Sequence, residues 1–90
     1  MKKVYIITWS DICPDTNDMH GISGVFGTLK GAKLALERLK QYEKQEIDTS
    51  VYEDIESMIE DFANGFVVNF GYHDYKMYEI IEREVEQWKH

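Results

Sequence analysis

The stretch Val4-Tyr5-Ile6-Ile7-Thr8-Trp9 decides the fold class. It combines β-branched and aromatic residues and is closed by the polar pair Ser10-Asp11, which is the composition of a buried strand. The sequence therefore predicts a strand over residues 3–9. Residues 10–23 are rich in Asp, Asn, Ser and Gly, so they predict a long polar loop. Gly24-Val25-Phe26 then predicts a short second strand.

Two helices are expected in the middle of the chain. After Thr28, a plausible N-cap, apolar side chains recur at steps of three and four residues, which predicts a helix over 29–44. Ser50-Val51-Tyr52-Glu53 matches a capping box, in which the Glu side chain reaches back to the Ser amide. A second apolar stripe follows and predicts a helix over 51–63, with Asn64-Gly65 as its C-terminal stop.

The last third of the chain predicts a strand and leaves the tail open. Phe66-Val67-Val68-Asn69-Phe70 has the composition of a strand, and Gly71-Tyr72-His73-Asp74 has that of a turn. The tail 75–88 fits a helix, because apolar residues recur in it at steps of 3, 4 and 3. It also fits a hairpin, because a lone strand needs a partner and Tyr78-Glu79-Ile80-Ile81-Glu82 suits that role.

Several of these segments together resemble a group of small uncharacterised α+β proteins from bacteria and their phages. The segments that carry the resemblance are Lys3-Val4-Tyr5-Ile6-Ile7, Gly24-Val25-Phe26 ahead of Ala32, Ala35 and Leu39, and Tyr78-Glu79-Ile80-Ile81-Glu82 with Trp88. The resemblance implies that the tail is at least partly a strand, and it implies no activity. The expected fold is one α+β domain over 1–90, a small, mainly antiparallel sheet with two helices packed on one face.

Composition excludes several classes of protein. Ninety residues with a 43% apolar fraction suit one folded domain with one core. Cys13 is the only cysteine, so an intramolecular disulfide and a multi-cysteine zinc site are both excluded. The apolar run near the start is too short for a secretion signal or a membrane span. A cytoplasmic location is therefore expected.

Charge is distributed unevenly along the chain. The net charge is -7, which argues against direct binding to nucleic acid or to an anionic membrane and favours a protein partner with a basic surface. Residues 1–44 contain seven Lys or Arg and five Asp or Glu, a balance of +2. Residues 45–86 contain twelve acids against Lys76 and Arg83, a balance of -10.

The acidic surface of residues 48–86 is the candidate functional site. It contains eight candidate carboxylates, six on or just before the expected second helix and two in the tail: Asp48, Glu53, Asp54, Glu56, Glu60, Asp61, Glu79 and Glu82. One interpretation is a solvated face that pairs with the basic stripe of helix 29–44. Another is a partner-binding face, in a non-enzymatic module such as a phage-type inhibitor of host defence that imitates nucleic-acid phosphates. A third is a homo-oligomer that joins the basic face of the first helix to the acidic face of the second.

The loop 11–20 offers an alternative function as a small metal-binding protein or an enzyme. Cys13 and His20 would supply its reactive side chains, with nearby Asp residues as further metal ligands. The loop lacks the terminal Glu of a calcium-binding EF-hand, and its spacing matches no recognised zinc motif. We therefore expect no metal, no other cofactor and no enzymatic activity.

Overall fold

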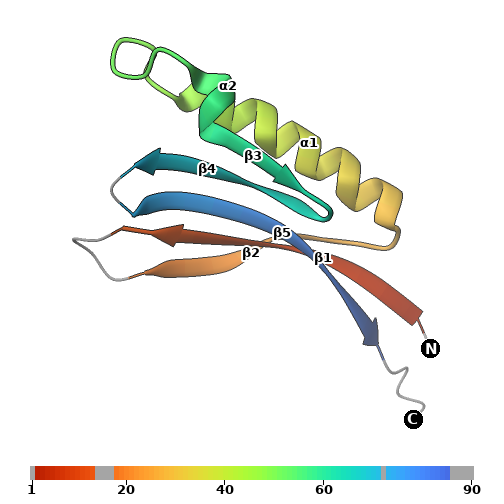
Figure 1. Cartoon of the computed structure of the whole chain (residues 1–90). Coiled ribbons are helices and arrows are strands. Elements are labelled where there is room, and N and C mark those ends of the chain that lie inside the picture. Colours follow the sequence, from red (N-terminus) through yellow and green to blue (C-terminus); the bar gives the residue numbers. More distant parts are fainter. Residues whose placement is uncertain (1, 14–17, 72, 86–90) are drawn as a thin grey trace.

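The computed structural model describes residues 2–13, 18–71 and 73–85 and shows a five-stranded sheet with helices on one face (Figure 1). The elements in chain order are β1 (Lys2–Ile12), β2 (Met19–Phe26), α1 (Leu29–Glu46), α2 (Ile55–Met58), β3 (Ile59–Phe62), β4 (Gly65–Gly71) and β5 (Asp74–Val85). The strand order is β2-β1-β5-β4-β3, and every neighbouring pair is antiparallel. The prediction of an α+β fold with a mainly antiparallel sheet is confirmed.

The first hairpin replaces most of the predicted polar loop. β1 continues to Ile12 and β2 begins at Met19, so the prediction of a loop over 10–23 is wrong. Polar residues there pair across the two strands, as Ser10 does with His20, and the neighbouring pair is Trp9 with Gly21. A side chain at Gly21 would collide with the Trp9 ring, so the absent Cβ lets the indole lie across the neighbouring strand. Residues 14–17 of the predicted loop lie outside the described residues.

The first helix agrees with its prediction and is slightly longer. The Thr28 hydroxyl accepts a hydrogen bond from the Gly31 backbone N–H at 3.0 Å, which caps the N-terminus as expected. The helix continues to Glu46, and the residue after it, Ile47, is buried. α1 contacts β1, β2, β4 and β5 and thus covers most of one face of the sheet.

The predicted helix over 51–63 is wrong. Only the four residues of α2 are helical, and Asp54 rather than Ser50 caps them. The next four residues form β3, which pairs with β4 through contacts such as Ile59 with Val68. The apolar side chains of this segment also fit a helical period. If the segment were a helix, however, β4 would be the edge of the sheet and its outward N–H and C=O groups would have no strand to pair with. Pairing with β3 satisfies these groups.

The tail forms a strand, as the resemblance implied, and not a helix. β5 is the central strand and pairs with β1 along its whole length and with β4 on its other side. The hairpin between β4 and β5 turns through Gly71, whose φ of 88° favours glycine. The part of the tail prediction that covers 86–88 lies outside the described residues.

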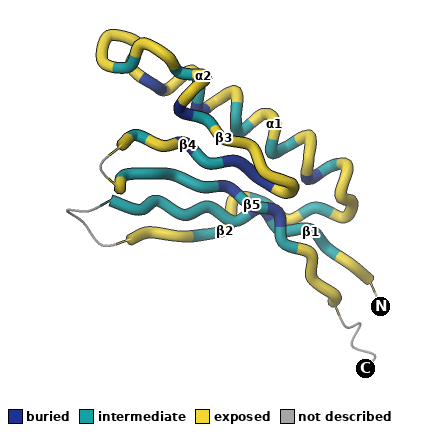
Figure 2. Tube along the Cα trace, in the orientation of Figure 1, coloured by how far each residue is buried: buried dark blue, intermediate teal, exposed yellow. Residues whose placement is uncertain are grey.

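The hydrophobic core lies between the helices and the sheet (Figure 2). Its buried apolar side chains are Ile7, Ala32, Ile47, Met58, Phe66, Val68, Tyr78 and Ile80. Phe66 and Tyr78 stack with ring centroids 5.0 Å apart. Among the described residues, no helix combines the length and the apolar character needed to cross a membrane.

Candidate functional site

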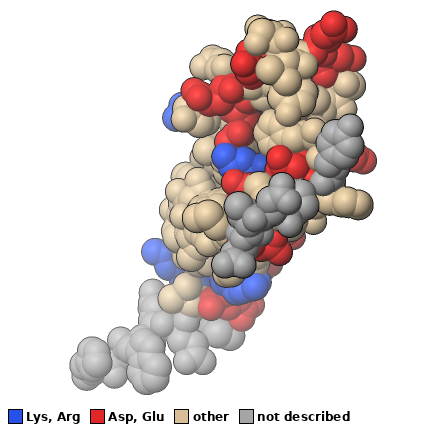
Figure 3. All heavy atoms as spheres, turned by 90° about the vertical axis from the view of Figure 1, so that its left-hand side faces the viewer, with Lys and Arg blue, Asp and Glu red and all other residues tan. Residues whose placement is uncertain are grey.

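Five exposed carboxylates surround the connection from α1 to α2, and we call them the acidic end. They are Glu46, Asp48, Glu53, Asp54 and Glu56. The sequence contains no Lys or Arg between Lys44 and Lys76, so the local field at this connection is negative. Figure 3 shows Asp and Glu side chains gathered over the upper part of the molecule, where α2 and this connection lie.

Local hydrogen bonds fix two of these carboxylates in place. The Asp48 side chain accepts from the Ser50 N–H at 2.9 Å and from the Ser50 hydroxyl at 2.6 Å. These two bonds lower the pKa of Asp48 below its ordinary value, so the side chain remains charged at neutral pH. The Asp54 side chain accepts from the Ser57 N–H at 3.2 Å and caps α2. The acidic end therefore has a defined backbone shape.

The other predicted carboxylates do not join this surface. Glu60 and Asp61 are neighbours on β3, and because strand side chains alternate they point to opposite faces of the sheet. Glu79 lies on the central strand, half-buried and facing away from α1. Glu82 lies toward the other end of β5, where its carboxylate is 3.7 Å from the Lys3 ammonium. The eight predicted carboxylates therefore do not form one acidic surface, because Glu60 and Asp61 lie on a strand and not on the predicted helix.

Part of the basic stripe of α1 is neutralised within the chain. The Lys40 ammonium lies 3.0 Å from the Asp61 carboxylate, and that hydrogen bond raises the pKa of Lys40. The Lys44 ammonium lies 3.1 Å from the Glu56 carboxylate at the edge of the acidic end. These contacts connect α1 to α2 and β3. Lys40 and Lys44, in the C-terminal half of the basic stripe, are therefore already paired with acids of the same chain.

A buried polar cluster, which the sequence reasoning missed, lies beneath α1. The Glu43 side chain is buried, and its Oε1 atom accepts from the Tyr78 hydroxyl at 2.8 Å and from the Lys76 ammonium at 3.0 Å. Burial, followed by the hydrogen bond to Glu43, raises the pKa of Tyr78 well above its ordinary value. The burial of Glu43 could have been predicted from the sequence. Glu43 lies four residues after Leu39 and four before Ile47, a spacing that places it on the apolar face of α1.

The cluster around Cys13 differs from the one that the loop suggested. Ligand-type atoms of Asp11, Cys13 and Asp74 lie within 4.8 Å of one another, and the Cys13 thiol donates to Asp74 at 3.4 Å. His20 pairs with Ser10 and therefore points to the opposite face of the sheet from Asp11. Cys13 and His20 consequently do not share a site. Residues 14–17 of the loop, which include the nearby Asp15, lie outside the described residues.

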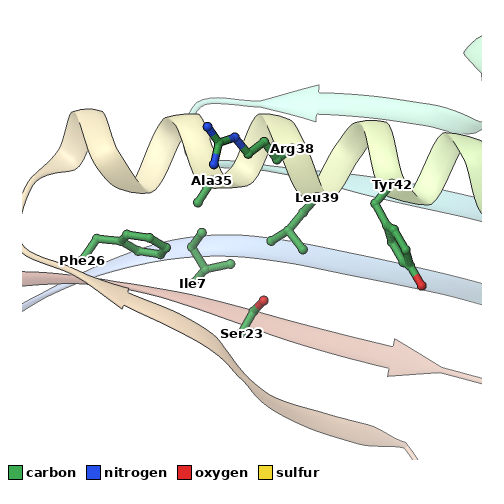
Figure 4. A pocket seen from close by; sticks show the side chains of 7 residues that line it. All are labelled: Ile7, Ser23, Phe26, Ala35, Arg38, Leu39 and Tyr42. Carbon is green, nitrogen blue, oxygen red and sulfur yellow. The ribbon is translucent and has the colours of Figure 1, made fainter.

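An apolar cleft separates α1 from the first hairpin. Its volume is about 340 Å³, and its walls are formed by Ile7, Ser23, Phe26, Ala35, Arg38, Leu39 and Tyr42. In Figure 4, Leu39 and Tyr42 point from the helix toward the sheet, while the Arg38 side chain lies along the helix. The walls are mainly apolar, and the three polar residues among them, Ser23, Arg38 and Tyr42, are exposed.

Comparison of the chain with protein-family models, with curated proteins and with solved structures gives no match. The function therefore has to be argued from the charges and surfaces described above.

Proposed function

We propose that the chain is a non-enzymatic protein-binding module that presents its acidic end to a basic surface of another protein. The observation that carries the proposal is the set of five exposed carboxylates between Lys44 and Lys76, of which Glu56 alone has an ion-pair partner among the described residues. An uncompensated field of this kind attracts a basic partner from a distance and speeds its association.

The order of the acidic end supports the same proposal. The Asp48 carboxylate accepts from the Ser50 N–H, and the Asp54 carboxylate accepts from the Ser57 N–H. Both carboxylates are therefore positioned before a partner binds. A binding surface that is already ordered loses less conformational entropy on association. The carboxylates lie on a turn and a one-turn helix and not in a row along a long helix, so the proposal rests on net charge and does not require phosphate spacing.

The test compares two variants with the same change in net charge. Glu46→Gln/Glu53→Gln/Glu56→Gln removes charge from the acidic end and leaves the two hydrogen-bonded carboxylates, Asp48 and Asp54, unchanged. Glu37→Gln/Glu82→Gln/Glu84→Gln removes the same charge elsewhere. An arginine-rich peptide is titrated into each isotope-labelled protein, and binding is followed by amide chemical shifts.

We expect amide shifts in residues 46–57 of the unmodified protein, and weaker binding with a flatter salt dependence only in the first variant. Equal weakening in both variants would show that the peptide senses overall charge and would contradict the proposal.

A further inference from the structure

The sheet has a second face that no described element covers, and we call it the open face. α1 and α2 lie on the other face, where Ile7 and Ile80 are buried opposite each other. Because side chains alternate along a strand, the neighbouring pair of Ile6 and Ile81 points to the open face. In Figure 1 the helices lie on one side of the strands only.

The open face is apolar where a solvated face would be polar. Its apolar side chains form two groups, which the pair Thr8 and Glu79 separates. The larger group consists of Val4, Ile6, Val25 and Ile81, and the smaller one of Val67 and Met77. An antiparallel sheet with water on one side normally alternates apolar and polar residues, whereas β1 is apolar at every position from Val4 to Ile7. Val25 is 59% exposed and Ile22 beside it is 64% exposed. Extended apolar patches of this kind are uncommon on monomers and mark interaction surfaces.

We propose that the open face packs against the open face of a second copy of this chain, forming a two-fold sandwich of sheets. A two-fold axis parallel to the strands and between β1 and β5 places β1 over β5 of the second copy and β2 over its β4. At about 4.8 Å between strands and about 3.3 Å per residue, this overlap is roughly 500 Å² of flat area per copy. The accessible area of a corrugated surface exceeds its flat area, and a stable interface buries about 800 Å² per partner.

The charges of the open face agree with this axis. Glu79 and Arg83 flank Ile81 on β5, and their partners across β1 are Thr8 and Val4. Because the axis exchanges β1 and β5, Glu79 of each copy faces Thr8 of the other and Arg83 faces Val4, so neither charged side chain lies directly over its own counterpart. An axis along β5 would instead place Glu79 on Glu79 and Arg83 on Arg83. The favoured axis brings Ile6 against Ile81 of the second copy at the centre.

The first test is the dimer dissociation constant, measured by sedimentation equilibrium. Ile6→Thr/Ile81→Thr keeps β-branched residues in both strands but removes apolar contact from the centre of the interface. We expect it to raise the dissociation constant at least about tenfold. Leu34→Gln, a change of a 58% exposed leucine on α1, is the control and is expected to leave the constant unchanged. A monomer at millimolar concentration, or a dimer indifferent to the double change, would overturn the proposal.

A second measurement needs no variant, so it decides the matter even if the double change impairs folding. Labelled and unlabelled copies of the unmodified chain are mixed, and isotope-filtered nuclear Overhauser spectra report contacts between copies only. We expect cross-peaks between the methyl groups of Ile6 and Ile81. Contacts confined to the α1 surface or to the outer edge of β2 would assign the dimer to another interface and refute the open-face arrangement.

Discussion

At the scale of single residues, Glu43 joins the helical layer to the sheet. Its carboxylate is the shared acceptor for the Tyr78 hydroxyl and the Lys76 ammonium. Glu43→Ala would leave both donors without this acceptor, and we expect it to lower the free energy of unfolding by about 3 kcal/mol. Chemical denaturation measures the loss. Glu46→Ala, at an exposed site on the same helix, should change the stability by no more than about 0.5 kcal/mol, and similar losses in both would contradict the role of Glu43.

Tyr78 predicts a specific dependence of stability on alkaline pH. Its pKa in the folded protein is raised above the ordinary value of 10.0, so the folded state holds the phenol proton more tightly than the unfolded state does. The associated stability is fully present below pH 10.0 and declines as the pH rises above that value. Tyr78→Phe should remove this part of the decline, as measured by denaturation at a series of alkaline pH values. An identical decline in both proteins would show that other groups cause it.

Gly65 is the position where a side chain is least tolerated. A Cβ there would collide with the backbone oxygen of Tyr78 and with the Phe62 ring, and the backbone oxygen belongs to the central strand and cannot move aside. We expect Gly65→Ala to destabilise the protein by about 3 kcal/mol. Gly27→Ala has no atom within 4 Å of the new Cβ and should be close to neutral. Thermal denaturation of the two variants measures the difference in stability. A Gly65→Ala variant as stable as Gly27→Ala would contradict the prediction.

At the scale of elements, the short helix α2 depends on its cap. The Asp54 carboxylate accepts from the Ser57 N–H, and a helix of four residues has few other backbone bonds of its own. We expect Asp54→Ala to cost about 1 kcal/mol and to increase hydrogen exchange at Ser57. Glu53→Ala, at the adjacent exposed position, is the control. Unchanged exchange at Ser57 in Asp54→Ala would mean that packing and not the cap holds the turn.

The elements that the sequence predicts well are those with strong local signals. The first helix has a cap at Thr28 and a regular apolar face, and the first strand has a run of β-branched residues from Val4, so both form where the pattern indicates. β3 and most of β2 form because a neighbouring strand offers hydrogen bonds, which a local pattern does not record. The same contrast explains which residues of the acidic surface could be predicted. The charge distribution predicted four of the five carboxylates of the acidic end and missed Glu46. The separation of Glu60 from Asp61 follows from strand pairing.

At the scale of the whole molecule, the unbalanced charge should make stability depend on salt. The net charge is -7, and the exposed ion pairs that salt would weaken contribute little each. Screening of the repulsion among acids should therefore dominate, and added sodium chloride is expected to raise the free energy of unfolding by up to about 1 kcal/mol. Glu46→Gln/Glu53→Gln/Glu56→Gln should reduce this gain. Urea denaturation at several salt concentrations measures it, and a loss of stability with salt would show that the ion pairs dominate.

The pairing of β1 with β5 also fixes where other molecules can be attached. Lys2 lies opposite Val85, so β1 begins and β5 ends at the same end of the sheet, far from the connection between α1 and α2 (Figure 1). A label attached at Lys2 or Val85 would therefore lie at the end of the sheet away from the carboxylates of that connection. Anchored to a sensor surface through either of these two positions, the protein would expose the same negatively charged tip to the solution.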